Sequence, residues 1–127
     1  MSTLKRIAYV EDETDIQEVA KMALELVGGF SVAVFSSGHE AVDKMAAFSP
    51  QLILLDVMMP GLDGPATLIR LREQESLKDV PAVFMTAKVQ THEVARYKEL
   101  GAVSVIAKPF DPMTLADQLK GIWENLP

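Results

Sequence analysis

Polar side chains that can do chemistry follow four apolar runs of this sequence. The first run ends in two acids, Glu11 and Asp12, and another ends in Asp56. Two later runs lead to Thr86 and to Lys108. If these runs are strands of an open parallel α/β sheet, their carboxyl ends lie along one edge, where such sheets bind ligands. The five side chains are therefore expected to lie together at that edge.

Three carboxylates at one edge repel one another, so at neutral pH they either keep protons or hold a cation. Oxygen ligands favour a hard ion such as magnesium (Mg2+), which keeps several waters that a phosphoryl oxygen can replace. The two histidines, His39 and His92, do not belong to these strand ends. Their positions speak against a zinc or redox-metal site.

Asp56 can also act as a nucleophile, because an aspartate carboxylate can accept a phosphoryl group as an acyl phosphate. Phosphoryl transfer needs positive charge and hydrogen-bond donors around the phosphoryl oxygens. Magnesium, the Lys108 ammonium and the Thr86 hydroxyl can supply them. The residues alone thus point to a phosphoacceptor site.

Length and composition fit one domain with a single core. The chain has 127 residues, a net charge of -6 and no cysteine. The acidic balance, without a run of Lys or Arg, argues against direct nucleic-acid binding. No apolar run reaches the roughly 20 residues of a membrane span, and the start lacks the features of a secretory signal, so a cytoplasmic location is expected. Without cysteine the chain forms no disulfide.

Strand-like runs alternate with helical patterns along the chain. Strands are expected at residues 6–10, 30–35, 52–55, 82–85 and 103–107. Helices are expected at about residues 14–27, 37–48, 65–74, 91–100 and 111–126. This alternation predicts an α/β fold with a parallel sheet and helices on both faces. The flavodoxin-like, doubly wound order 2-1-3-4-5 places the first and third strands side by side.

Helix ends and faces are predicted from local signals. Capping boxes are expected at Thr14 with Gln17 and at Ser37 with Glu40, and the last helix is expected to begin at Asp111. The apolar spacing of the first helix predicts that it buries one face, made of Ile16, Val19, Ala20, Ala23, Leu26 and Val27.

Taken together, the strand-end residues resemble the receiver domains of bacterial two-component response regulators, over essentially the whole chain. The matching motifs are the acidic pair at 11–12, the segment DVMMPGLDG from Asp56, Thr86 with Ala87, and the segment KPF from Lys108. Each motif alone is weak, whereas the combination is highly specific. The strand order given above rests partly on this resemblance.

The resemblance implies that Asp56 takes its phosphoryl group from a phosphohistidine on a sensor histidine kinase or a histidine phosphotransfer protein. It implies magnesium held by Asp12, Asp56 and the backbone carbonyl of Met58, with Glu11 assisting. Lys108 would contact the phosphoryl oxygens, and its bond to Pro109 looks like the family's cis peptide bond. Such a domain catalyses only its own phosphorylation and dephosphorylation.

Two features depart from the family pattern. The fifth strand often carries an aromatic residue three positions before the lysine, which swings inward together with the threonine, and this chain has Val105 there. Valine is short and stiff, so a muted or differently routed switch is expected. Met58 and Lys88 flank the path of the hydrolytic water and offer neither a carboxylate nor an amide to orient it, so slow loss of the phosphoryl group is expected.

Alternative functions remain open. A phosphatase working through an aspartyl phosphate needs a second acid two residues after the nucleophile, where this chain has Met58. A flavodoxin needs a loop that binds the flavin phosphate, and the sequence EDETD would repel it. A receiver-shaped adaptor that acts without phosphorylation is a third possibility. The chain ends soon after its last helix and so resembles a stand-alone receiver without an output domain, which would bind a target through its fourth helix, fifth strand and fifth helix.

Overall fold

The computed structural model describes residues 3–127 and contains one parallel sheet. Its five strands lie in the order β2-β1-β3-β4-β5, which confirms the predicted topology. They are β1 (Arg6–Val10), β2 (Ser31–Phe35), β3 (Leu52–Asp56), β4 (Ala82–Thr86) and β5 (Ser104–Ala107). The strand boundaries lie within one residue of those expected from the apolar runs.

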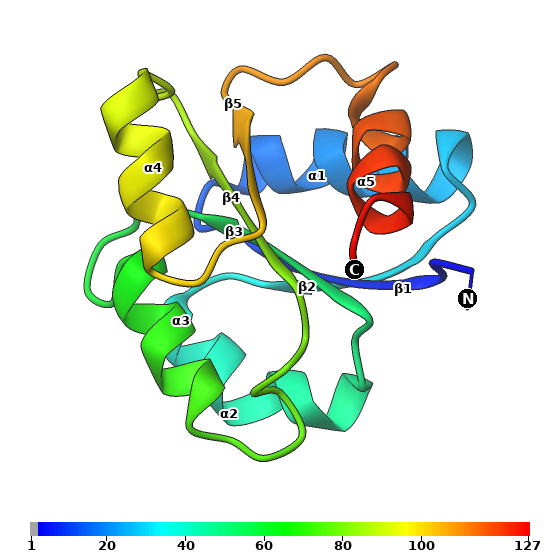
Figure 1. Ribbon diagram of the computed structural model, residues 1–127. Helices are drawn as coiled ribbons and strands as arrows, with labels where there is room; N and C mark the ends of the chain where they lie inside the picture. Colours follow the sequence, from blue (N-terminus) through cyan, green and yellow to red (C-terminus); the bar gives the residue numbers. More distant parts are fainter. Residues whose placement is uncertain (1–2) are drawn as a thin grey trace.

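Helices cover both faces of the sheet, as Figure 1 shows: α1 and α5 lie on one side, and α2, α3 and α4 on the other. They are α1 (Thr14–Met22), the π-helical turn η1 (Ala23–Val27) that continues α1, α2 (Gly38–Phe48), α3 (Gly64–Arg72), α4 (Thr91–Glu99) and α5 (Leu115–Glu124). Across residues 3–127, no helix has the length and apolar character needed to cross a bilayer.

The sheet separates two apolar layers, and its central strands are buried on both faces. Along β3, Leu52 and Leu54 pack in the layer of α1 and α5, whereas Ile53 and Leu55 pack in the layer of α2, α3 and α4. Side chains of a strand alternate between the two faces. Asp56 therefore continues the row of Leu52 and Leu54, on the side of α1 and α5.

The predicted capping box of α1 is wrong. Glu13 precedes the helix in an extended conformation, and no side chain caps the first turn. The Gln17 side-chain amide instead donates to the carbonyl of Glu11 and to Ser36 Oγ. Because those groups belong to the loops that follow β1 and β2, Gln17 fixes the strand ends rather than its own helix.

The helix α2 begins as expected. Ser37 Oγ accepts a hydrogen bond from the Glu40 amide at 3.0 Å, as an N-cap does. The Glu40 carboxylate accepts from the Ser36 amide at 3.1 Å, one residue before the cap. The capping box is therefore present with its second bond shifted by one residue.

The start of the last helix was predicted too early. Asp111 Oδ1 accepts from the Met113 amide at 2.9 Å and so closes a turn before the helix. The helix begins at Leu115, preceded by Thr114 at the N-cap. A short polar turn of this kind satisfies backbone amides as a helix cap does. Asp111 therefore marks the turn before the helix and not the start of the helix.

The predicted apolar face of the first helix is only partly buried. Ala20 and Ala23 are buried, but Val19, Leu26 and Val27 are 46%, 78% and 44% exposed. A π-helical turn holds more residues than an α-helical one, so η1 takes Leu26 and Val27 out of the 3.6-residue phase that would face the core. Exposed apolar side chains are the result.

Candidate functional site

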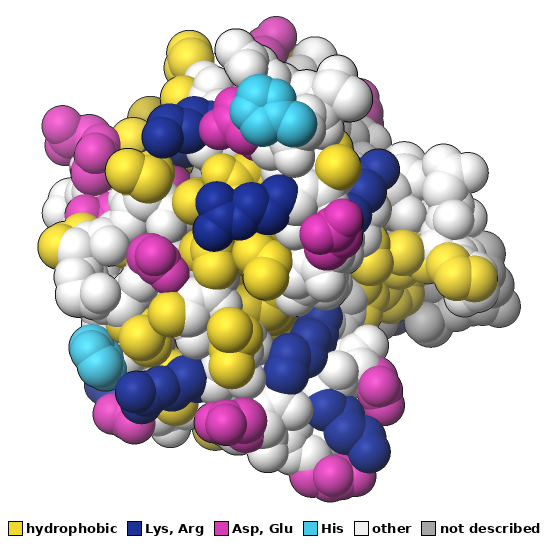
Figure 2. Space-filling view, turned by 60° about the vertical axis from the view of Figure 1, so that its left-hand side comes forward, with side chains coloured by type: hydrophobic (Ala, Val, Ile, Leu, Met, Phe, Trp, Pro, Cys, Tyr) yellow, Lys and Arg dark blue, Asp and Glu magenta, His cyan; other side chains and the backbone are white. Residues whose placement is uncertain are grey.

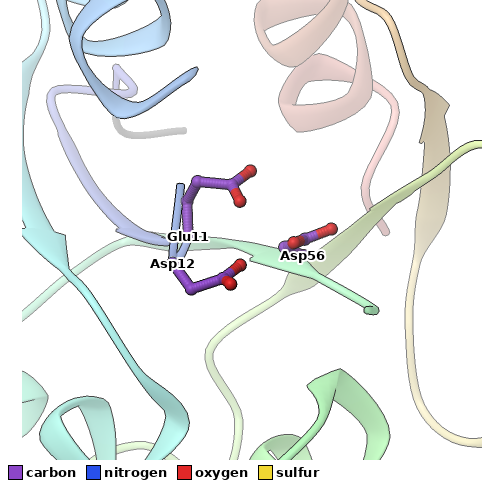
Figure 3. A group of neighbouring side chains, drawn as sticks. All are labelled: Glu11, Asp12 and Asp56. Carbon is purple, nitrogen blue, oxygen red and sulfur yellow. The ribbon is translucent and has the colours of Figure 1, made fainter. Parts of the chain in front are cut away.

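Three carboxylates meet where β1 and β3 end. The strands pair in parallel with Val10 opposite Leu55, so the residues that follow lie side by side. One carboxylate oxygen from each of Glu11, Asp12 and Asp56 lies within 4.8 Å of the others. Figure 3 shows the side chains of the two neighbouring acids directed toward Asp56. Glu11 is fully buried and Asp56 is 2% exposed.

Lys108 bridges two of these acids. Its Nζ donates to Glu11 Oε1 at 2.8 Å and lies 3.2 Å from Asp56 Oδ1. The backbone amide of Lys108 donates to the carbonyl of Thr86 at 2.9 Å, so the lysine is anchored at the end of β4 and reaches across it. The peptide bond from Lys108 to Pro109 is cis, as the resemblance implied.

The electrostatics of the cluster show an excess of negative charge. Burial, followed by the neighbouring Glu11 carboxylate, raises the pKa of Asp56 to about 7, although Lys108 acts in the opposite direction. Burial lowers the pKa of Lys108, but its bonds to Glu11 and Asp56 outweigh this and raise it overall. The lysine therefore stays charged, and it does not neutralise the site on its own.

The donor set fits a hard divalent cation. Among residues 3–127, these three acids form the one group of His, Asp and Glu side chains whose ligand atoms approach this closely. All three offer oxygen, the ligand atom that magnesium and calcium prefer. Because burial and then the Glu11 carboxylate raise the pKa of Asp56, additional positive charge at the cluster would favour its ionised form.

The remaining predicted site residues line the same edge at different depths. Thr86 is buried at the end of β4, and its Oγ1 accepts from the Lys88 amide at 3.1 Å. Val105 lies on β5 opposite Phe84 and is partly buried against the core. The Met58 side chain is 65% exposed, two residues beyond Asp56.

A tyrosine that the sequence analysis overlooked also touches the cluster. Tyr9 is completely buried in β1, and its hydroxyl donates to Glu11 Oε1 at 3.2 Å. The alternation of a strand places residues two apart on the same face. One hydroxyl in the otherwise aliphatic run before Glu11 was the signal that could have revealed it.

An apolar groove beside the site was overlooked as well. It has a volume of about 350 Å³ and is lined by Glu18, Val19, Met22, Ala23, Leu26, Val27, Pro112 and Met113. A second groove of about 270 Å³ is lined by Asp15, Ile16, Val19, Lys108, Pro109 and Phe110. Because Val19 lines both grooves, they form a continuous apolar surface that leads to Lys108.

Comparison with known proteins identifies the family. A family model of the response regulator receiver domain matches residues 7–120. Response regulator Rre1 of Synechocystis sp. is 35% identical over 94% of this chain and 50% of its own length. The phosphate regulon transcriptional regulatory protein PhoB of Escherichia coli is 34% identical over 96% of this chain and 53% of its own length.

The solved structures agree with this match. The chemotaxis protein CheY4 of Vibrio cholerae superimposes with a TM-score of 0.86 at 26% identity, covering 94% of this chain and 99% of that one. The chain spans about half the length of the curated relatives that it matches. Both the family model and these relatives cover nearly all of its residues, and the chain belongs to the family of response regulator receiver domains.

Proposed function

We propose that this chain is a phosphoacceptor in a two-component phosphorelay, with Asp56 as the residue that is phosphorylated. The observation that carries this proposal is a buried carboxylate at a strand end, 3.2 Å from a lysine ammonium and beside two further acids. The donor is a phosphohistidine of a sensor histidine kinase or a histidine phosphotransfer protein.

In the proposed reaction an Asp56 oxygen attacks phosphorus while the bond from phosphorus to the donor imidazole nitrogen breaks. An acyl phosphate forms, and the electron pair of the broken bond stays on the imidazole nitrogen, which takes up a proton from water so that the donor histidine leaves as neutral imidazole. Lys108 moves its hydrogen bond from Asp56 to a phosphoryl oxygen, and the Thr86 hydroxyl donates to another. Donors of this kind each contribute about 3 kcal/mol when charge develops in the transition state.

The nucleophile must be ionised, because a carboxyl group that holds its proton attacks poorly. Lys108 alone leaves the pKa of Asp56 at about 7, so the proposed reaction needs further positive charge. Glu11, Asp12, Asp56 and the backbone carbonyl of Met58 are the residues proposed to hold magnesium, which would supply that additional positive charge when bound. The chain's own activity is limited to its phosphorylation and dephosphorylation.

The phosphodonor is proposed to dock over the apolar groove of α1 and η1. That groove is continuous with the one lined by Lys108, so a partner lying in it is held next to the phosphoacceptor. Its apolar lining remains exposed on the free chain, and exposed apolar patches commonly mark protein interfaces. A helical donor that presents its histidine above an apolar face fits this geometry.

The downstream target is proposed to bind on the face of α4, β5 and α5. A groove of about 480 Å³ lies between β5 and α5, lined by Val103, Ser104, Val105, Ile106, Gln118, Gly121, Ile122, Asn125 and Leu126. The proposed location of the protein is the cytoplasm, and neither nucleic acid nor a membrane is a proposed direct partner.

Incubation with acetyl phosphate tests the proposal without requiring the cognate donor. With magnesium present, the chain should gain about 80 Da, the mass of one phosphoryl group, and chelation of magnesium by EDTA should prevent the gain. An unmodified chain under both conditions would favour a phosphorylation-independent adaptor. Continuous release of phosphate from small phosphate esters would favour a phosphatase instead.

A further inference from the structure

Tyr9 occupies an unusual position for a polar side chain. It is fully buried in the apolar cluster between the sheet and the helices α1 and α5. Its hydroxyl donates to Glu11 Oε1 at 3.2 Å. A buried tyrosine hydroxyl needs a hydrogen-bond partner. The bond from Tyr9 therefore holds the Glu11 side chain against the core.

Glu11 is held from several directions. Its Oε1 accepts from the Tyr9 hydroxyl and from Lys108 Nζ, and its Oε2 accepts from the Glu13 amide at 3.3 Å. Lys108 in turn contacts Asp56. A series of contacts thus runs from Tyr9 through Glu11 and Lys108 to Asp56.

In this series of contacts, Lys108 is shared by two carboxylates. It lies 2.8 Å from Glu11 Oε1 and 3.2 Å from Asp56 Oδ1, so Glu11 holds it more closely. A second donor on the same Glu11 oxygen offsets part of the negative charge there. The Tyr9 hydroxyl, which donates to that oxygen at 3.2 Å, is this second donor.

We propose that Tyr9 is a positioning residue for phosphoryl transfer: its hydroxyl fixes Glu11 and weakens the hold of Glu11 on Lys108, leaving the ammonium available to Asp56 and the incoming phosphoryl group. This inference rests on the proposed function. The hydrogen bond of Tyr9 is to Glu11, and Tyr9 acts through that residue.

The test replaces Tyr9→Phe, which removes the hydroxyl and keeps the ring. The rate of phosphorylation by acetyl phosphate at saturating magnesium should fall about tenfold, as expected for a lost hydrogen bond to a charged group. Tyr97→Phe is the matched control, because Tyr97 is also buried but lies in the opposite layer. Its rate should equal that of the native chain.

A double-mutant cycle separates positioning from general destabilisation. In a Glu11→Gln background, Tyr9→Phe should change the rate by less than about twofold, because the partner charge is already gone. An equal tenfold loss in both backgrounds would overturn the inference. So would an unchanged rate in Tyr9→Phe alone.

A spectroscopic measurement keeps the inference testable apart from the proposed function. In the magnesium-free chain, Tyr9→Phe should shift the side-chain carboxyl carbon resonance of Glu11, and Tyr97→Phe should leave it in place. If the native chain is never phosphorylated, the proposed function fails while this shift still reports on Tyr9. An unshifted Glu11 signal would overturn the positioning role.

Discussion

The two flanks of the sheet edge that carries Asp56 are built differently. On the α1 side, Met22 and Leu26 are 59% and 78% exposed and line an apolar groove. On the α4 side, Tyr97 is the one buried residue of the helix, and its ring centroid lies 5.3 Å from that of Phe84 in an edge-to-face arrangement. In Figure 2, which brings the side of α3 and α4 forward, basic and acidic side chains are interspersed with small apolar areas.

The two flanks therefore differ in how much apolar surface they expose and in how firmly they are packed. The α1 flank offers apolar contact area whatever the state of Asp56. The α4 flank is held by few buried side chains, so shifting it costs little free energy. An apolar flank suits a partner that binds before phosphorylation, as proposed for the phosphodonor. The α4 flank can shift more easily, but the short and stiff Val105 is expected to limit the change that reaches it.

The strands show a similar contrast. Every residue of β3 and β4 is buried, whereas β5 lies at the sheet edge with Ser104 and Val105 partly buried and Ala107 exposed. Asp56 and Thr86 are thus carried by the rigid centre of the sheet, and Lys108 follows its more exposed edge. A change in the lysine contact is therefore transmitted most easily to β5.

The largest expected effect comes from disrupting the apolar groove on the α1 flank. Met22→Glu places a charge in the apolar groove, and transfer from a phosphohistidine donor should slow about 100-fold, the loss typical of a central interface residue. Phosphorylation by acetyl phosphate should be unchanged, because that small donor needs no docking surface. The two rates are compared in the same preparation.

Ile69→Glu is the control for this comparison, since Ile69 is similarly exposed, at 57%, but lies on α3. It should leave both rates unaltered. Equal slowing by the two substitutions, or slowing with acetyl phosphate as well, would contradict the assignment of docking to the α1 flank.

The acidic cluster between the flanks should make stability depend on pH. The pKa of Asp56 rises from 3.8 to about 7 on folding in the absence of metal, so the unfolded chain releases this proton at lower pH than the folded one. Stability is therefore lost as pH rises from about 4 to about 7. Asp56→Asn removes this loss, and its stability advantage over the native chain should grow across that window and stay constant above it.

Denaturant unfolding of both chains in EDTA at several pH values measures this advantage. Glu11, Asp12 and Lys108, the charged groups that face Asp56, are present in both chains, so their own titration largely cancels. Magnesium should reduce the advantage by stabilising the native carboxylates. A difference that is the same at every pH would show that Asp56 is not under electrostatic stress.

A smaller effect concerns the lifetime of the phosphoryl group. The side chains of Met58 and Lys88 are exposed beside the site and offer no acceptor to orient a water. Met58→Asn should speed release of phosphate by up to about 100-fold, the lower end of what a group that assists water contributes. A time course of phosphate release compares the two, and faster release from the native chain would refute the expectation.

The smallest expected effect is a change in the backbone resonances of the α4 flank. When beryllofluoride occupies the phosphoryl site, backbone resonances around Asp56 and Thr86 should shift more than those of residues 94–100, because Val105 is too short and stiff to carry the change outward. Val105→Tyr should enlarge the shifts at 94–100. Large and equal shifts in both regions of the native chain would show that α4 is coupled by another route.

The sequence predicted the strands and the side chains that gather at one edge of the sheet, whereas the strand order also rested on the resemblance to receiver domains. Apolar runs that end in acids, a threonine and a lysine mark both the strands and their carboxyl ends, so Asp56 and Lys108 could be assigned to one edge before their contacts were known. The 2.8 Å and 3.2 Å contacts of Lys108 and the raised pKa of Asp56 depend on burial and distance. These distances and this pKa shift exist only in the folded chain, so the sequence could not predict them.

Other features depend on competition between local alternatives, which residue spacing does not reveal. Gln17 bonds two loop ends instead of capping its helix, and Asp111 closes a turn before the helix that it was expected to begin. The exposure of Leu26 follows from a π-helical turn, which an apolar pattern read at 3.6 residues cannot show. The bond from Tyr9 to Glu11 was hidden because the tyrosine was read as one more apolar residue.

The central claim is that Asp56 accepts the phosphoryl group, and intact mass spectrometry tests it most directly. After treatment with acetyl phosphate and magnesium, the native chain and Asp43→Ala, which alters an exposed acid of α2, should each carry an adduct of about 80 Da. Asp56→Ala should carry none. An undiminished adduct in Asp56→Ala would contradict the account.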